Sequence, residues 1–175
     1  MPECYADTLL IETLVPTKSG YNHKFGCFNV EAEMKHGKLK DQFAVGIIDK
    51  DKTIIGYLLE FEEIDKVEGS LILWRHKKVE KHHFVIQICP ALERWVLKVC
   101  ETENIDLHGL GLSRDLEVLK KFSKTRKSIE DKSLMALFRE ISLKENNVNV
   151  RKIKVWVTLL KEKNYQVDIK ALQHG

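Results

Sequence analysis

Apolar runs of strand length alternate with polar loops over the first part of the chain. Residues 7–15 (DTLLIETLV) form an apolar run interrupted by Glu12, and its length and β-branched content predict a buried strand. Residues 27–37 predict a short helix that ends at Gly37. Residues 42–49 (QFAVGIID) are almost continuously apolar, which is typical of a strand buried on both faces of a parallel sheet. Strand, helix and strand in this order predict a right-handed βαβ unit.

The next part of the chain continues this pattern. Residues 55–69 are compatible with a strand or a short helix, residues 70–77 and 82–89 predict two further strands, and Pro90 opens a helix over 91–105. After residue 110 the pattern becomes helical. Three amphipathic helices are predicted over 113–124, 128–142 and 149–165, with serine or asparagine near their starts.

The predicted fold class is therefore α/β. We expect residues 1–110 to form a small, mostly parallel sheet of about four strands flanked by helices. Residues 111–175 are expected to form a helical C-terminal extension that packs on this domain.

Composition and charge narrow the class of protein. Hydrophobic residues make up 43% and charged residues 31% of the 175, as in a soluble globular protein. The apolar runs are too short for a bilayer span of roughly 20 residues, and the N-terminus lacks the basic region of a signal peptide. A cytoplasmic protein without a membrane partner is expected. Residues 114–175 hold 15 basic and 8 acidic side chains, which fits a surface that meets polyanions or a lysine-rich surface kept for solubility.

Carboxylates follow the predicted strands at matching places. Glu12 lies towards the end of the first strand, while Asp49 and Asp51 lie at the end of the second. Ligands of an open parallel sheet bind outside the carboxyl ends of its strands, so these three acids can share one rim. Asp49 and Asp51 point the same way in an extended segment, and carboxylate oxygens are the ligands that Mg²⁺ prefers. Glu93, in the first turn of the helix after a strand, either joins this rim or serves only the helix dipole.

A glutamate at the end of a first strand, followed by a βαβ step and an apolar strand that ends in DxD, resembles the Toprim domain. That family includes topoisomerases, primases, OLD-family nucleases and small stand-alone bacterial proteins. The matching residues are "LLIETLV" with Glu12 and "VGIIDKDK" with Asp49 and Asp51, and "HFVIQICPALERWVL" with Glu93 is similar to a later strand-to-helix step. The resemblance covers roughly residues 7–107.

The resemblance implies a magnesium- or manganese-dependent protein that acts on nucleic acid phosphodiesters with a nuclease-type activity. Asp49 and Asp51 would hold Mg²⁺, Glu12 would act as the general acid or base or bind a second metal ion, and Glu93 would be an additional ligand. A divalent cation at such a site neutralises phosphoryl charge and activates the attacking oxygen.

Basic residues in two loops are candidate contacts to a nucleic acid backbone. His23 and Lys24 lie in the glycine-bounded loop after the first predicted strand. Arg75 and Lys77 belong to the basic run RHKKVEKHH. The alternative for His23 and Lys24 is a polar connecting loop, and for Arg75 and Lys77 it is a charged hairpin turn.

Two other readings stay open. A Toprim-like fold could bind a metal ion, a nucleotide, a partner protein or a second copy of itself without turnover. "DKDKT" also fits the first motif of haloacid-dehalogenase phosphatases, but the acidic pair Glu130–Asp131 lies in a predicted helix cap, and Glu12 would be left without a role.

Overall fold

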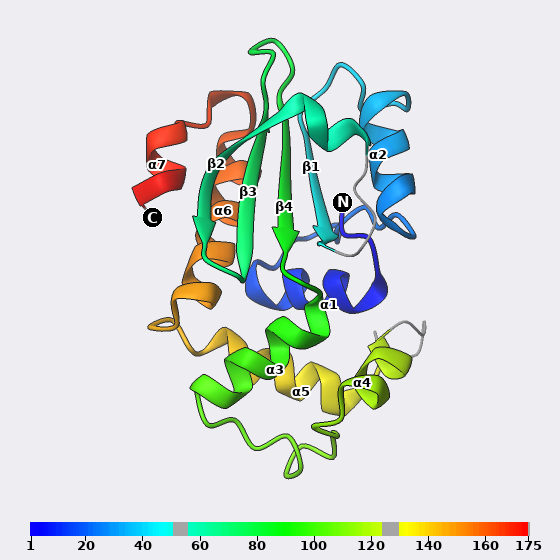
Figure 1. Ribbon diagram of the computed structural model, residues 1–175, viewed down its shortest axis with the longest axis vertical. Helices are drawn as coiled ribbons and strands as arrows, with labels where there is room; N and C mark the ends of the chain where they lie inside the picture. Colours follow the sequence, from blue (N-terminus) through cyan, green and yellow to red (C-terminus); the bar gives the residue numbers. More distant parts are fainter. Residues whose placement is uncertain (51–55, 124–129, 175) are drawn as a thin grey trace.

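The computed structural model shows a four-stranded mixed sheet with helices on both faces (Figure 1). The structure describes residues 1–50, 56–123 and 130–174. In chain order the elements are α1 (Tyr5–Leu14), α2 (Cys27–Lys35), β1 (Ala44–Asp49), η1 (Gly56–Glu60), β2 (Phe61–Val67), β3 (Leu71–His76), β4 (His83–Ile88), α3 (Leu92–Thr102), α4 (Leu116–Ser123), α5 (Lys132–Ser142), α6 (Val148–Lys163), η3 (Asn164–Gln166) and α7 (Ile169–His174).

The strand order is β1-β4-β3-β2. The sheet is mixed, which corrects the prediction of a mostly parallel sheet. β1 runs parallel to β4, with Ala44 opposite His83 and Asp49 opposite Ile88. β4 and β3, and β3 and β2, run antiparallel. The reason is the length of the connections. Only short turns separate β2, β3 and β4, and such turns join antiparallel neighbours, whereas a long segment separates β1 from β4.

The prediction of a strand over residues 7–15 is wrong, because Tyr5–Leu14 forms the helix α1. Its start is closed by a capping box, in which the Sγ of Cys4 accepts from the Asp7 amide at 3.3 Å and Asp7 Oδ2 accepts from the Cys4 amide at 3.1 Å. The buried positions Ala6, Leu9, Leu10 and Leu14 recur at helical spacing. This spacing outweighs the β-branched content on which the strand prediction relied.

A different segment takes the place of the predicted first strand. The chain begins alongside β1, where Pro2 pairs in parallel with Ile47. The Glu3 amide donates to the Ile47 carbonyl at 3.0 Å, and the Ile47 amide donates to the Met1 carbonyl at 3.0 Å. The segment that pairs with β1 is therefore at Pro2, before the run 7–15 that predicts a strand. The helices α1 and α2 lie between this segment and β1.

The two faces of the sheet bury different cores. The larger core joins Ile47, Leu73 and Ile86 to α1, α3, α5 and α6. The smaller core, on the other face, contains Ile48 and Val85 together with α2 and η1. β4 is buried along its whole length, as expected for a strand covered on both faces. At Gly46 of β1 an added Cβ would lie 2.9 Å from Val30 and 3.1 Å from Met34, so α2 packs directly on the strand there.

The remaining predictions of secondary structure are confirmed. α2, β1, β3, β4 and α3 lie where the sequence placed them, and the ambiguous segment 55–69 divides into η1 and β2 within its described part. The three predicted C-terminal helices are α4, α5 and α6, and the short helix α7 was not predicted. Among the described residues, no helix has the length and apolar character needed to cross a membrane.

Candidate functional site: a carboxylate rim

β1 and β4 both end beside the first turns of α1 and α3 (Figure 1). Asp49 is the last residue of β1, and its Oδ1 accepts a hydrogen bond from the Leu92 amide at 2.9 Å. The residue before α3 is Ala91, which has no side chain that could cap the helix. Asp49 therefore supplies the cap of α3 from a distant part of the sequence.

Glu93 follows Leu92 in the first turn of α3 and is only 8% exposed. The hydrogen bond between Asp49 and Leu92 fixes the end of β1 next to this turn. The negative charge of Glu93 is one of the causes that raise the pKa of Asp49. The structure thus brings together the two predicted site residues Asp49 and Glu93.

Two further acids reach the same rim from the N-terminal segment. Glu3 is held by the hydrogen bond of its amide to Ile47, two residues before Asp49. Asp7, in the first turn of α1, is 1% exposed. Its Oδ2 accepts from Cys4, whereas its buried Oδ1 has no hydrogen-bond partner among the residues that the structure describes. We refer to Glu3, Asp7, Asp49 and Glu93 as the carboxylate rim.

The carboxylate rim is electrostatically unfavourable as it stands. Burial raises the pKa of Asp49 to about 9, helped by the negative charges of Asp7, Glu3 and Glu93 and opposed by the Leu92 amide. Burial and the charge of Glu93 likewise raise the pKa of Asp7 to about 7, against the hydrogen bonds from Cys4. Like charges in a desolvated place favour protonation or a bound cation.

Glu12 does not join the rim in this structure. Its Oε1 accepts a hydrogen bond from the Tyr21 amide at 3.3 Å. Burial raises the pKa of the Tyr21 hydroxyl, and the negative charge of Glu12 raises it further. Asp7 and Glu12 are five residues apart on α1, a rotation of ~140° around the helix axis. The two carboxylates therefore leave α1 on different sides.

The remaining predicted ligand, Asp51, lies outside the described residues, so its role as a ligand of Mg²⁺ stays a prediction. Within the described ranges, no three Asp, Glu, His or Cys side chains are close enough together to form a preformed metal cage. The donor set still fits Mg²⁺ chemically, since that ion is usually held by one or two carboxylates plus waters and substrate oxygens. The unpartnered Oδ1 of Asp7 is a buried oxygen of the required kind.

His23 and Lys24 lie close to the carboxylate rim. The Lys24 amide donates to the Pro2 carbonyl at 3.0 Å, so this loop runs beside the segment that carries Glu3. The Lys24 ammonium pairs with Glu33 at 2.8 Å. Burial lowers the pKa of His23, although a hydrogen bond to the Glu3 backbone acts in the opposite direction. Its imidazole is therefore neutral at neutral pH.

Arg75 and Lys77 lie at the other end of the sheet. β3 is antiparallel to β4, so Arg75 pairs with Phe84 near the start of β4, while Asp49 pairs with Ile88 at its end. Four residues of strand separate these levels, about 13 Å. The Lys77 ammonium donates to the Leu59 carbonyl at 3.0 Å. These two residues do not belong to the same site as the carboxylate rim.

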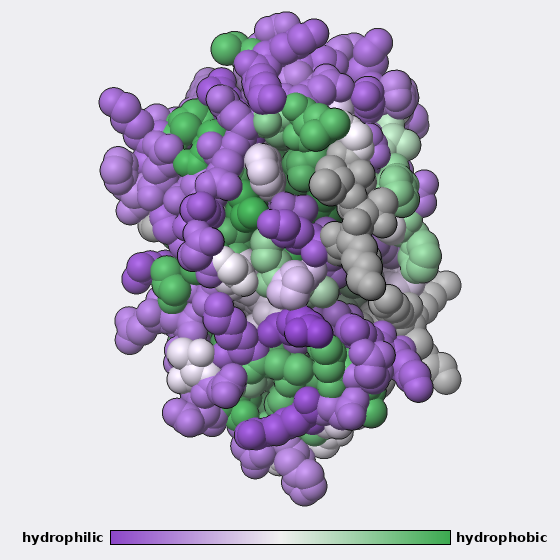
Figure 2. Space-filling view, viewed as in Figure 1, coloured by the Kyte–Doolittle hydropathy of each residue, from purple (hydrophilic) through white to green (hydrophobic). Residues whose placement is uncertain are grey.

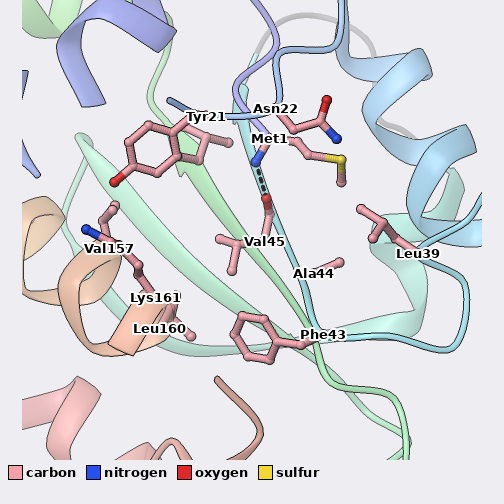
Figure 3. Close-up of a pocket in the computed structure, with 11 residues that line it drawn as sticks. Met1, Tyr21, Asn22, Leu39, Phe43, Ala44, Val45, Val157, Leu160 and Lys161 are labelled. Atoms are coloured by element: carbon pink, nitrogen blue, oxygen red, sulfur yellow. Dashed lines mark hydrogen bonds between the residues drawn. The ribbon is translucent and has the colours of Figure 1, made fainter. Parts of the chain in front are cut away.

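An apolar hollow of about 290 Å³ lies against the first half of β1 (Figure 3). Phe43 and Val45 line it from the strand side, and Val157 and Leu160 line it from α6. At one side the Met1 nitrogen donates to the Val45 carbonyl at 2.5 Å. Of the described residues that line this hollow, none is a predicted site residue, and none is an aspartate, glutamate or histidine.

Sequence reasoning missed Glu3 and Asp7. Glu3 precedes the run 7–15 and Asp7 is its first residue. Because that run predicts a strand, the sequence pattern gave neither acid a place at the start of a helix. The available signal was Cys4 followed three residues later by Asp7, just before apolar residues at helical spacing. Comparison of the chain with protein-family models, with curated proteins and with solved structures finds no match.

Proposed function

We propose that this chain is a Toprim-like protein that uses Mg²⁺ or Mn²⁺ to act on nucleic acid phosphodiesters, as a nuclease does. One observation carries the proposal: four acids from three separate segments converge where the parallel strands β1 and β4 end. Ligands of α/β sheets bind at that end. The burial of these acids is costly without a cation.

In this proposal Glu3 takes the role first given to Glu12. Pro2 pairs in parallel with β1, the helices α1 and α2 follow, and β1 ends at Asp49, so Glu3 would occupy the position that the resemblance gives to the glutamate. Asp49, Asp7 and Glu93 would offer oxygens to the cation, with Asp51 as a further predicted ligand. The cation would neutralise phosphoryl charge, and Glu3 would hold or transfer the proton of the attacking water.

The test is cleavage of supercoiled plasmid and of labelled single-stranded DNA and RNA, with Mg²⁺, with Mn²⁺ and with EDTA. We expect cation-dependent cleavage that falls by about 100-fold or more in Asp49→Asn and in Glu3→Gln. Glu162→Gln, an exposed acid on α6, is the matched control and should cleave like the unchanged protein. Full cleavage by Asp49→Asn would contradict the proposal.

Glu12→Gln decides between the two glutamates. Loss of cleavage in this variant, with activity kept in Glu3→Gln, would return the catalytic role to Glu12.

A binding module without turnover is the second candidate. It is favoured by the absence of a three-residue metal cage in the described part of the chain. Calorimetry that detects Mg²⁺ or Mn²⁺ binding lost in Asp49→Asn, together with no cleavage of any of the three substrates, would select this candidate.

A further inference from the structure

Three rings form a stepped aromatic surface next to the carboxylate rim. The ring centroids of Tyr5 and His23 are 4.4 Å apart, and the ring of Phe25 lies 6.5 Å from Tyr5 and 6.4 Å from His23. The rings are inclined to one another by 54° to 67°. We call these three residues the aromatic step.

Phe25 is the exposed member of the aromatic step, whereas Tyr5 and His23 are half-buried. Phe25 shows 66% of its surface to solvent, and Phe28 in the first turn of α2 shows 58%. In the space-filling view, green hydrophobic atoms follow the right-hand edge of the molecule over α2 (Figure 2). Because the Phe25 ring contacts the rings of Tyr5 and His23, the three rings form a contiguous surface of the kind that marks a binding site.

The backbone ties the aromatic step to the carboxylate rim. Tyr5 lies between Glu3 and Asp7 in the sequence. The Gly26 amide, directly after Phe25, donates to the Glu3 carbonyl at 2.8 Å. The rings and the carboxylate rim are therefore carried by the same two backbone segments.

The polar groups beside the rings fit the edge of a base. An open hollow of about 520 Å³ has His23 and Phe25 on one side and Asn29, Glu33 and His36 of the α2 region on the other. These side chains include both donors and acceptors, as base recognition requires. Residues 16–42, which contain the hollow, carry five lysines against three acids, and of these lysines Lys24 is paired with Glu33 at 2.8 Å and Lys35 with Glu60 at 3.1 Å.

From these observations we infer that the aromatic step binds an unpaired base of a single-stranded nucleic acid by stacking. The inference rests on the proposed function for its class of substrate. It adds the place where the strand is held: a base stacked on the exposed ring of Phe25, with its edge towards Asn29 and Glu33. Stacking is tolerant of sequence because every base has a π-face.

The test uses a fluorescein-labelled oligothymidylate of about 12 nucleotides, a length within the usual site size of single-strand binders. Fluorescence anisotropy in EDTA keeps the strand intact, so binding is measured without cleavage. We expect Phe25→Ala to weaken binding about tenfold, the loss of one stacked base. Phe25→Trp should bind at least as tightly as the unchanged protein, and Leu143→Ala, which removes a side chain that is 72% exposed on another surface, should have no effect.

Three results would overturn the inference. They are no binding of the strand by the unchanged protein, equal binding by Phe25→Ala, and equal loss in Phe25→Ala and Leu143→Ala. A change in self-association of Phe25→Ala with unchanged strand affinity would assign the rings to a protein interface instead. Ring-dependent binding without cation-dependent cleavage would contradict the proposed nuclease function but not the stacking site. Cation-dependent cleavage together with binding that does not depend on Phe25 would support the nuclease function and contradict the stacking site.

Discussion

Asp49 has two effects that act in opposite directions on the stability of the fold. Its Oδ1 caps α3 through the Leu92 amide, which satisfies a backbone donor at the start of the helix. Its negative charge, however, is buried beside other acids, which raises its pKa to about 9. An aspartate in an unfolded chain has a pKa near 3.9. The folded protein therefore binds a proton at Asp49 that the unfolded chain has already lost at neutral pH.

Asp49→Asn should raise the free energy of unfolding above pH 5. Because the folded pKa is the higher one, the stability that Asp49 contributes is greatest below pH 4 and falls as the pH rises towards 9. The asparagine amide oxygen still accepts from Leu92 and carries no charge. We expect a gain on the order of 2 kcal/mol at pH 8, or about 4–8 °C in the midpoint of thermal unfolding, with little difference between the two proteins at pH 4.

The matched control for this experiment is Asp41→Asn, whose side chain is 77% exposed and should show no such pH dependence. Mg²⁺ should raise the unfolding temperature of the unchanged protein and not that of Asp49→Asn, because a cation that binds only the folded state stabilises it. A lower unfolding temperature of Asp49→Asn at pH 8 would contradict the electrostatic account.

At the scale of the element, α1 shows why the first prediction failed. Its run TLLIETLV contains β-branched residues that are common in strands, but ten residues with Ala6, Leu9, Leu10 and Leu14 buried form one helical face. Local propensity was outweighed by packing, since this face contacts α5 and the sheet core.

Leu10→Ala should destabilise the protein by about 2–5 kcal/mol, because Leu10 is fully buried and its removal leaves a cavity in the larger core. Thr13→Ala should be nearly neutral. The Thr13 hydroxyl donates a hydrogen bond to the Leu9 carbonyl of its own helix at 2.7 Å, and alanine has the higher helix propensity. Urea denaturation checks both values. A large loss in Thr13→Ala with a small one in Leu10→Ala would indicate a strand.

The strongly patterned elements were predictable, and the rim was predictable only in part. β4 and α3 carry clear signals in their own sequence, an apolar run and a proline-led amphipathic pattern. Asp49 and Glu93 were found because they directly follow such signals. Glu3 could not be found in this way, since residues 1–3 are placed by their backbone hydrogen bonds to β1 and show no hydrophobic period of their own. Strand direction was missed because it depends on the short turns around β3.

At the scale of the whole molecule, the C-terminal helices are fastened to the sheet by one polar cluster. The Lys152 ammonium donates to Asp65 of β2 at 2.9 Å and to the Gln173 carbonyl at 2.8 Å. The indole of the buried Trp156 donates to the same carboxylate and to the Leu172 carbonyl at 3.0 Å. β2, α6 and α7 thus meet at Asp65.

Asp65→Asn should lower the free energy of unfolding by about 1–3 kcal/mol, because the Lys152 side chain is only 12% exposed and would lose its counter-charge. The loss should shrink when Lys152→Met is combined with Asp65→Asn, since no uncompensated ammonium is then left. Chemical denaturation of both single variants and the double variant gives the coupling energy directly. Additive losses would show that the pair does not act as a unit.

The parallel pairing of β1 with β4 bears on the order in which the molecule assembles. β2, β3 and β4 can pair through short turns as soon as they collapse, whereas β1 ends at residue 49 and must find a strand that starts at residue 83. Such non-local pairings form slowly, because the chain between β1 and β4 loses conformational entropy before the strands make stabilising contacts. We therefore expect β1 to dock late in folding. The repulsive acids then meet only in the last step, when the rest of the protein is already able to hold them together.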